Sequence, residues 1–216
     1  SRLSSDSLQE LHKLLLLKDW IAHPNNFIFS GYVMTKDEHD TDSPMKPFPD
    51  KPYLRKIIEV IHESDRLFIP KSRQIMMSWV AVLYSLWLCL FHPHQAVFIQ
   101  SKKEEDAAAL VFDKKMENAR MSFVYHHLPD WLKEMVPVDT SYAKMRFGNG
   151  SIAHGIPEGA HIIRSRTASL VVSDECAFQP EFEEAYTAAV PMAKKIVGLS
   201  SACGGTFFGD ICCEVI

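Results

Sequence analysis

Residues 169–175 restrict the fold of this chain more than any other stretch. They read Ser-Leu-Val-Val-Ser-Asp-Glu, a short apolar run that ends in two adjacent carboxylates. Buried parallel strands contain such apolar runs, and open α/β sheets bind ligands at the carboxyl ends of their strands. Asp174 can hold Mg²⁺ at such a point, and Glu175 can orient and deprotonate an attacking water. The alternative is a strand followed by a helix N-terminus, where the helix dipole favours acids.

A second strand and loop lie about a hundred residues upstream. Residues 66–69 form a short apolar strand, and a long apolar helix begins near Ser78. A strand, a short loop and a helix form the layout of a P-loop, whose amides and helix N-terminus bind an anion. In the pattern G-x-x-x-x-G-K-[ST], Lys71 and Met76 occupy the glycine positions, Met77 the lysine position and Ser78 the final one. The sequence therefore lacks a standard Walker A motif.

A loop without the Walker A glycines and lysine can still bind phosphate and a metal ion if other residues supply the charge and the hydroxyl. Lys71 and Arg73 flank the start of the loop, and either can be the main phosphate ligand, while Ser78 keeps the metal-binding hydroxyl. The alternative for Lys71 is a solvated loop residue. The residues expected to bind the nucleotide here are Lys71, Ser72, Arg73, Gln74, Met77 and Ser78.

The order of these motifs resembles the large terminase subunit of tailed bacteriophages. The resemblance extends from Pro47-Phe48-Pro49 through the loop at 71–78 and the Asp-Glu pair to Ser200-Ser201-Ala202 and Phe207-Phe208. It implies a Mg²⁺-dependent ATPase that drives double-stranded DNA into a procapsid in the host cell cytoplasm. It also implies a ring of identical subunits, with the portal protein and the small terminase subunit as partners. Only the N-terminal ATPase part is covered, without the family's C-terminal nuclease domain.

The resemblance also implies roles for single residues. Glu175 is expected to be the catalytic base, with Ser78 and Asp174 at the metal. Pro49 and Tyr53 are candidates for stacking on adenine, with packing as the alternative. Ser200 and Ser201 are expected to sense the γ-phosphate. Arg164, or Arg166 in its place, is expected to act on the ATP of a neighbouring subunit, or else to be a surface arginine paired with an acid or contacting DNA.

The predicted fold is a P-loop-type α/β ATPase of the additional-strand, catalytic-glutamate class. Alternating strands and helices predict a mostly parallel sheet covered on both faces. By the resemblance, the strand at 195–199 lies between those at 66–69 and 169–175. Residues 1–50 are predicted to be a helix and loop appendage, and residues 51–216 the ATPase domain. Two alternative functions are a helicase-like nucleic-acid-stimulated ATPase and a catalytically silent scaffold.

The remaining elements follow from periodicity and turn residues. A loop is predicted at 35–52, and its acids lack the pattern of a calcium site. A capping box from Ser101 to Glu104 predicts a helix that runs to about residue 120. Helices are also predicted at 4–20, 53–63 and 181–189, and strands at 95–100, 144–147 and 151–154, the last two joined by a tight turn at 147–151.

Composition sets limits on function. The chain has 216 residues, of which 47% are hydrophobic, so it can bury a substantial core. Its net charge of −4 argues against coating nucleic acid through a basic surface, although a transient grip on DNA is compatible with it. The five cysteines lack C-x-x-C spacing, and the histidines lack a convincing metal pattern, so reduced cytoplasmic thiols are expected. The apolar runs are too short to span a bilayer.

Overall fold

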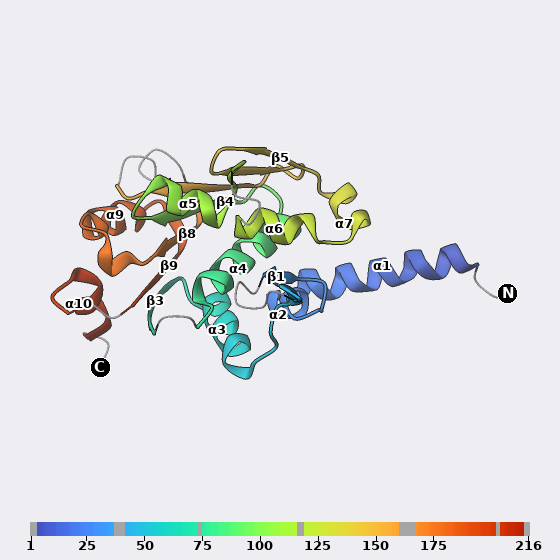
Figure 1. Cartoon of the computed structure of the whole chain (residues 1–216), viewed down its shortest axis with the longest axis horizontal. Helices are drawn as coiled ribbons and strands as arrows, with labels where there is room; N and C mark the ends of the chain where they lie inside the picture. The colour runs from blue at the N-terminus through green and yellow to red at the C-terminus, as the bar shows by residue number, and fades with distance from the viewer. Residues whose placement is uncertain are drawn as a thin grey trace.

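The computed structural model describes residues 4–36, 42–72, 75–115, 119–159, 167–201 and 204–213 (Figure 1). One sheet of seven strands forms its centre, in the order β3-β9-β8-β4-β7-β6-β5. The pairs from β3 to β7 are parallel, and those from β7 to β5 are antiparallel. The prediction of a mostly parallel sheet is therefore confirmed. The strands are β3 (Arg66–Lys71), β4 (Ala96–Ser101), β5 (Val138–Ser141), β6 (Lys144–Phe147), β7 (Ile152–Pro157), β8 (Ala168–Asp174) and β9 (Ala193–Ser201).

The strand β9 lies between β3 and β8, as predicted. Its register places Ser201 opposite Lys71 of β3 and Leu199 opposite Asp174 of β8. Because all three strands are parallel, their carboxyl ends meet at one edge of the sheet. This edge collects the ends of the strands that carry the predicted loop, the acidic pair and the serine pair.

The two faces of the sheet bury different side chains. Leu170 and Val172 of β8 belong to the large core cluster that includes most of α4 (Met77–Phe91), whereas Val171 belongs to a second cluster with Ala189 of α9 (Phe182–Ala189). Side chains of a strand alternate between faces, so α4 and α9 cover opposite faces of the sheet. Full burial on both faces explains why β8 is a continuous apolar run.

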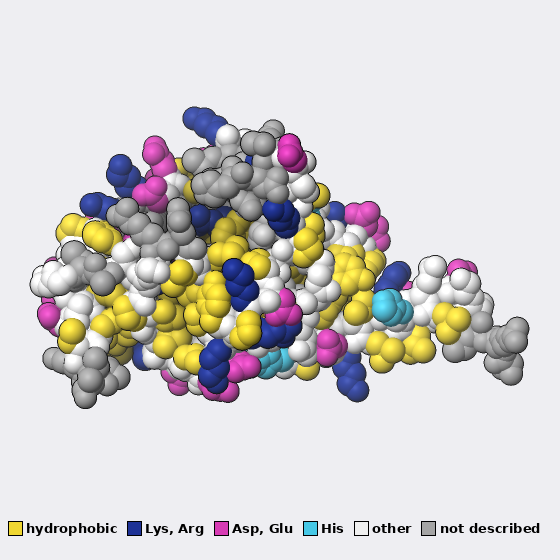
Figure 2. Space-filling model, turned by 60° about the horizontal axis from the view of Figure 1, so that its bottom comes forward, with side chains coloured by type: hydrophobic (Ala, Val, Ile, Leu, Met, Phe, Trp, Pro, Cys, Tyr) yellow, Lys and Arg dark blue, Asp and Glu magenta, His cyan; other side chains and the backbone are white. Residues whose placement is uncertain are grey.

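Further helices pack around this sheet. They are α1 (Ser5–Ala22), α2 (Pro24–Ile28), α3 (Pro52–Glu63), α5 (Glu104–Leu110), α6 (Arg120–His126), α7 (Asp130–Met135), the 3₁₀ turn η1 (Cys176–Phe178) and α10 (Phe207–Cys213). The helix α1 extends away from the body (Figure 1), and hydrophobic side chains on it are exposed (Figure 2), among them Leu8 and Leu15. Its other end is anchored, because the buried Trp20 accepts a hydrogen bond of 2.7 Å from the Trp87 indole through its carbonyl oxygen. Among the described residues, no helix is both long and apolar enough to cross a membrane.

Three predictions for single elements are wrong, and two of them concern a loop and a helix cap. The predicted loop at 35–52 contains an antiparallel pair, β1 (Met34–Lys36) and β2 (Met45–Pro47), which the Phe48 amide extends by bonding the Val33 carbonyl oxygen. The capping box at Ser101 does not form, because Ser101 stays in β4 opposite Pro157 of β7. The residue at the N-cap of α5 is Lys103, which makes no side-chain cap.

The helix that starts at Glu104 is also shorter than predicted. It ends at Leu110, after which the buried carbonyl of Val111 accepts a bond of 3.1 Å from the Ser122 amide of α6. The chain therefore turns back and packs α6 on α4, a tertiary contact that overrides the helix propensity of the alanine run. The sequence patterns also missed β5, which pairs with β6 at the far edge of the sheet.

The C-terminal end of α3 is fixed to the sheet by one lysine. The ammonium of Lys195, near the start of β9, donates to the carbonyl oxygens of Ile61 at 2.6 Å and His62 at 3.2 Å. It also donates to the Ser64 carbonyl oxygen just beyond the helix. A cation here satisfies carbonyl groups that the helix leaves without partners and is favoured by the helix dipole.

Candidate nucleotide site

The acidic pair lies at a sharp change of backbone direction. Asp174 is the last residue of β8 and is 8% exposed, while Glu175 adopts a left-handed conformation with a φ of 54° before the turn η1. A non-glycine residue in this region is strained, and such strain concentrates at functional sites. The turn directs the two neighbouring carboxylates to different partners.

Asp174 is joined to the first turn of α4. The Ser78 hydroxyl lies 2.8 Å and 3.0 Å from the two carboxylate oxygens of Asp174, to which it donates. Burial raises the pKa of Asp174, and the hydrogen bond from Ser78 acts in the opposite direction. A buried carboxylate with a hydroxyl beside it presents hard oxygen ligands of the kind that Mg²⁺ prefers. These two side chains therefore fit a magnesium ion.

Glu175 forms an ion pair with Lys71. The Lys71 ammonium, at the end of β3, lies 2.5 Å from one carboxylate oxygen of Glu175. The Lys71 side chain is 8% exposed and that of Glu175 is 38% exposed. Burial raises the pKa of Glu175, but the hydrogen bonds from Lys71 and Ser201 outweigh it, so the pKa is lowered from its usual value. Glu175 is therefore a carboxylate at neutral pH.

The serine pair at the end of β9 holds the acidic turn. The amide and hydroxyl of Ser201 lie 3.3 Å and 3.4 Å from the second carboxylate oxygen of Glu175. The Ser200 hydroxyl is buried and accepts a bond of 3.1 Å from the Ala177 amide. The structure thus brings Lys71, Ser78, Asp174, Glu175 and both serines together at one edge of the sheet.

The other predicted site residues are not among the side chains that meet at this edge. Ser72 is exposed, and the Met77 side chain is 2% exposed within the main core, so only the backbone of Met77 remains for a phosphate. Pro49 is half-buried beside the buried Phe48, and Tyr53, in the first turn of α3, is 42% exposed. Arg73, Gln74, Arg164, Arg166 and Ala202 lie outside the described residues.

Gln179 is a supporting residue that the sequence patterns missed. Its side-chain amide donates a bond of 2.8 Å to the Asp174 carbonyl oxygen, and the residue is 4% exposed. The bond holds the chain just after the strand, where the backbone turns. No motif contains this glutamine, and only its position five residues after Asp174 connects it with the site.

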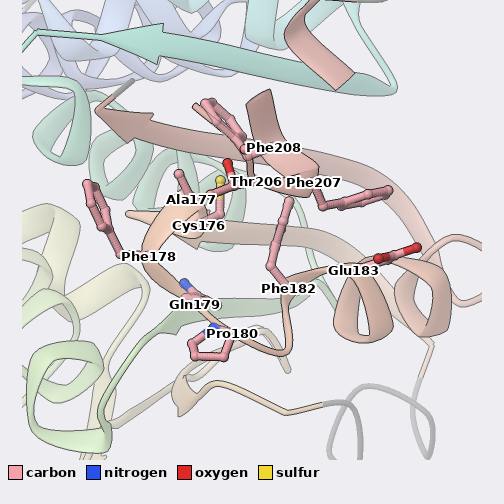
Figure 3. A pocket seen from close by; sticks show the side chains of 11 residues that line it. Cys176, Ala177, Phe178, Gln179, Pro180, Phe182, Glu183, Thr206, Phe207 and Phe208 are labelled. Atoms are coloured by element: carbon pink, nitrogen blue, oxygen red, sulfur yellow. The ribbon is translucent and has the colours of Figure 1, made fainter. Parts of the chain in front are cut away.

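A cavity of about 340 Å³ lies next to this turn (Figure 3). It is lined by residues that follow Glu175 and by the start of α10, with Phe178, Phe182 and Phe207 among its side chains. The side chains of Lys71, Ser78 and Asp174 do not line it. A triphosphate needs cations and metal ligands, which the aromatic side chains of this cavity do not supply.

Comparison with solved structures shows the fold. The HK97 bacteriophage large terminase superposes with a TM-score of 0.60 at 14% identity, over 86% of this chain and 37% of that one. The ATPase domain of the Thermus phage P74-26 large terminase gives 0.53 at 18% identity, over 74% and 68%. The large terminase of the thermophilic bacteriophage D6E, solved in complex with ADP, gives 0.51 at 15% identity, over 70% and 39%.

These similarities show that the chain has the P-loop-type fold of terminase ATPase domains. The chain spans well under half of the length of the complete HK97 and D6E chains that it matches. The sequence matches no protein-family model.

Proposed function

We propose that this chain is an ATPase domain that hydrolyses ATP with Mg²⁺ and powers the packaging of double-stranded DNA into a phage procapsid. The observation that carries the proposal is the convergence of Lys71, Ser78, Asp174 and Glu175 at the carboxyl edge of the sheet. Support also comes from the fold, which is that of large terminase ATPase domains, one of them solved with ADP.

The proposed chemistry assigns one task to each side chain. Lys71 replaces the missing Walker A lysine and binds phosphate oxygens with its buried ammonium, whereas Arg73 is the competing ligand. Ser78 and Asp174 hold Mg²⁺, which neutralises the charge of the phosphates when it is bound. Glu175, an ionised carboxylate held by Ser201, accepts the proton of the attacking water.

The further parts of the proposal concern the assembled motor. Tyr53 and Pro49 contact the adenine, Ser200 and Ser201 sense the γ-phosphate, and Arg164 or Arg166 acts on the ATP of the next subunit in a ring. Residues 1–50 are an appendage to the ATPase domain at 51–216, although Trp20 and Phe27 pack in the main core. The portal protein and the small terminase subunit are the proposed partners, in the host cell cytoplasm.

The test is the conservative variant Glu175→Gln. It keeps the shape of the side chain but cannot accept a proton, so ATP hydrolysis should fall by about 10²-fold or more, with nucleotide binding retained. Phosphate release is measured in the presence of double-stranded DNA, at a temperature where circular dichroism shows that the variant is folded. Glu184→Gln, an exposed glutamate of α9, is the matched control and should hydrolyse normally. Turnover by Glu175→Gln near that of the unmodified chain would refute the assignment.

A further inference from the structure

The helix α1 carries apolar side chains on two different faces. Leu16 packs against the main core, and Trp20 belongs to it. Leu8, Leu11 and Leu15 are spaced by three and four residues, so they share another face of the helix, and they are 46–58% exposed. We call these three side chains the leucine face. A surface helix that covers a core normally has one apolar stripe, so a second stripe indicates a further partner.

The position of α1 keeps the leucine face away from the rest of its own chain. The helix has 18 residues, which corresponds to a length of about 27 Å, and its N-terminal part extends from the body (Figure 1). Hydrophobic side chains are exposed along this extension (Figure 2). The other described elements therefore leave the leucine face largely open to solvent, at a distance from the body where another molecule can reach it.

The aromatic cavity of Figure 3 lies at the opposite end of the molecule. Its walls come from η1, the start of α9 and α10, and Figure 1 shows α9 and α10 at one end of the long axis and the N-terminus of α1 at the other. Phe178, Phe182 and Phe207 are among the lining side chains, and Phe178 is 41% exposed. The volume of about 340 Å³ is at the lower end for ligand pockets, so it suits a few aliphatic side chains.

We propose that the leucine face of one copy of this chain packs into the aromatic cavity of the next copy. The leucines supply aliphatic side chains without a cover, and the cavity supplies apolar walls without an occupant. Because the two features lie at opposite ends of one molecule, only a second copy can join them. A contact between two different surfaces is heterologous, so it repeats from copy to copy and either closes into a ring or continues as a filament. The inference rests on the proposed function only for the closure into a ring.

The first experiment measures self-association by sedimentation velocity over a range of concentrations, without nucleotide and with a reductant that keeps the free thiols reduced. The unmodified chain should associate as its concentration rises. The double variant Leu11→Gln/Leu15→Gln should associate about 100-fold more weakly or worse, because each leucine loses about tenfold or more, while glutamine keeps the helix. Phe178→Gln should lose about tenfold or more for the same reason. Met135→Gln, at an exposed methionine of α7, is the control and should associate normally.

The second experiment mixes the leucine variant with Phe178→Gln, at a concentration where neither associates alone. The mixture contains one intact cavity and one intact leucine face, so it should form dimers that do not grow further. If α1 instead pairs with α1 of another copy, Phe178→Gln should associate like the unmodified chain, and that result would overturn the inference. An unmodified chain that stays monomeric at its highest soluble concentration would also overturn it. Because no nucleotide is present, neither failure affects the test of hydrolysis with Glu175→Gln.

Discussion

The unequal burial of Lys71 and Glu175 predicts the outcome of a double-mutant cycle. In Glu175→Gln the Lys71 ammonium, 8% exposed, loses its counter-charge in a place that water barely reaches. In Lys71→Met the Glu175 carboxylate, 38% exposed, remains hydrated and keeps its bonds to Ser201, while the methionine fills the space of the lysine stem. The first variant should therefore be destabilised more than the second.

The magnitudes follow from the exposure of each partner. Breaking a fully buried pair costs about 3–5 kcal/mol and an exposed pair contributes about 0–1 kcal/mol. For this half-buried pair we expect a loss of about 2–3 kcal/mol in Glu175→Gln and less than about 1 kcal/mol in Lys71→Met. In a chain of this size, the larger loss lowers the melting temperature by about 4–12 °C. The double variant should recover most of that loss, because no unpaired charge remains.

The assay is urea unfolding followed by circular dichroism, under reducing conditions because Cys89 and Cys176 are free thiols. The exposed pair of Lys56 and Glu59 in α3 is the control, and its two single variants should each change stability by less than about 1 kcal/mol. Equal losses in Lys71→Met and Glu175→Gln, or additive losses in the double variant, would refute the argument from unequal burial.

Two further predictions concern stability. Asp174→Asn should raise the melting temperature at neutral pH, because burial raises the pKa of Asp174 and so disfavours its charged form in the folded chain. This gain in melting temperature should shrink as the pH falls through the raised pKa of Asp174. Protonation then removes the cost of the buried charge from the unmodified chain as well. A gain in melting temperature that does not depend on pH would contradict the prediction. Lys195→Met should lose about 1.5–3 kcal/mol in urea unfolding, because three carbonyl groups lose a charged donor. The exposed neighbour Lys194 is the control, and an equal loss in Lys194→Met would show that the contacts at α3 contribute nothing.

The sheet could be predicted because its signals are local. The apolar run of β8 is buried on both faces, and the turn that contains Asn149 and Gly150 joins β6 to β7 as its residues indicate. The position of β9 between β3 and β8 followed from the resemblance to terminases and is confirmed by the strand order. The extent of α5 could not be predicted, because it depends on the bond between Val111 and Ser122, whose partner lies in another helix.

The sequence indicated that Lys71, Ser78 and the Asp174-Glu175 pair would lie close together, but it did not indicate the contacts between them. Lys71 and Glu175 were both expected near the phosphates, and their direct ion pair depends on the register of β3, β9 and β8. That register depends on the pairing of the whole sheet, and the sequence of neither motif indicates it. Gln179 was missed because its bond to the Asp174 carbonyl oxygen depends on the sharp turn that follows β8.

The left-handed backbone of Met76 shows that a P-loop sequence pattern contains two separate requirements, one for a backbone conformation and one for a positive charge. Met76 precedes α4 with a φ of 61°, at the position where the pattern has its second glycine. Glycine enters this region without steric cost, so the letter in the pattern records a shape of the chain. The lysine, one position before the last, records a charge, which in the proposed function Lys71 supplies from the opposite end of the loop. A glycine at position 76 would make the sequence match the pattern at one more residue. It would not add a lysine at position 77, so the charge would still have to come from another residue.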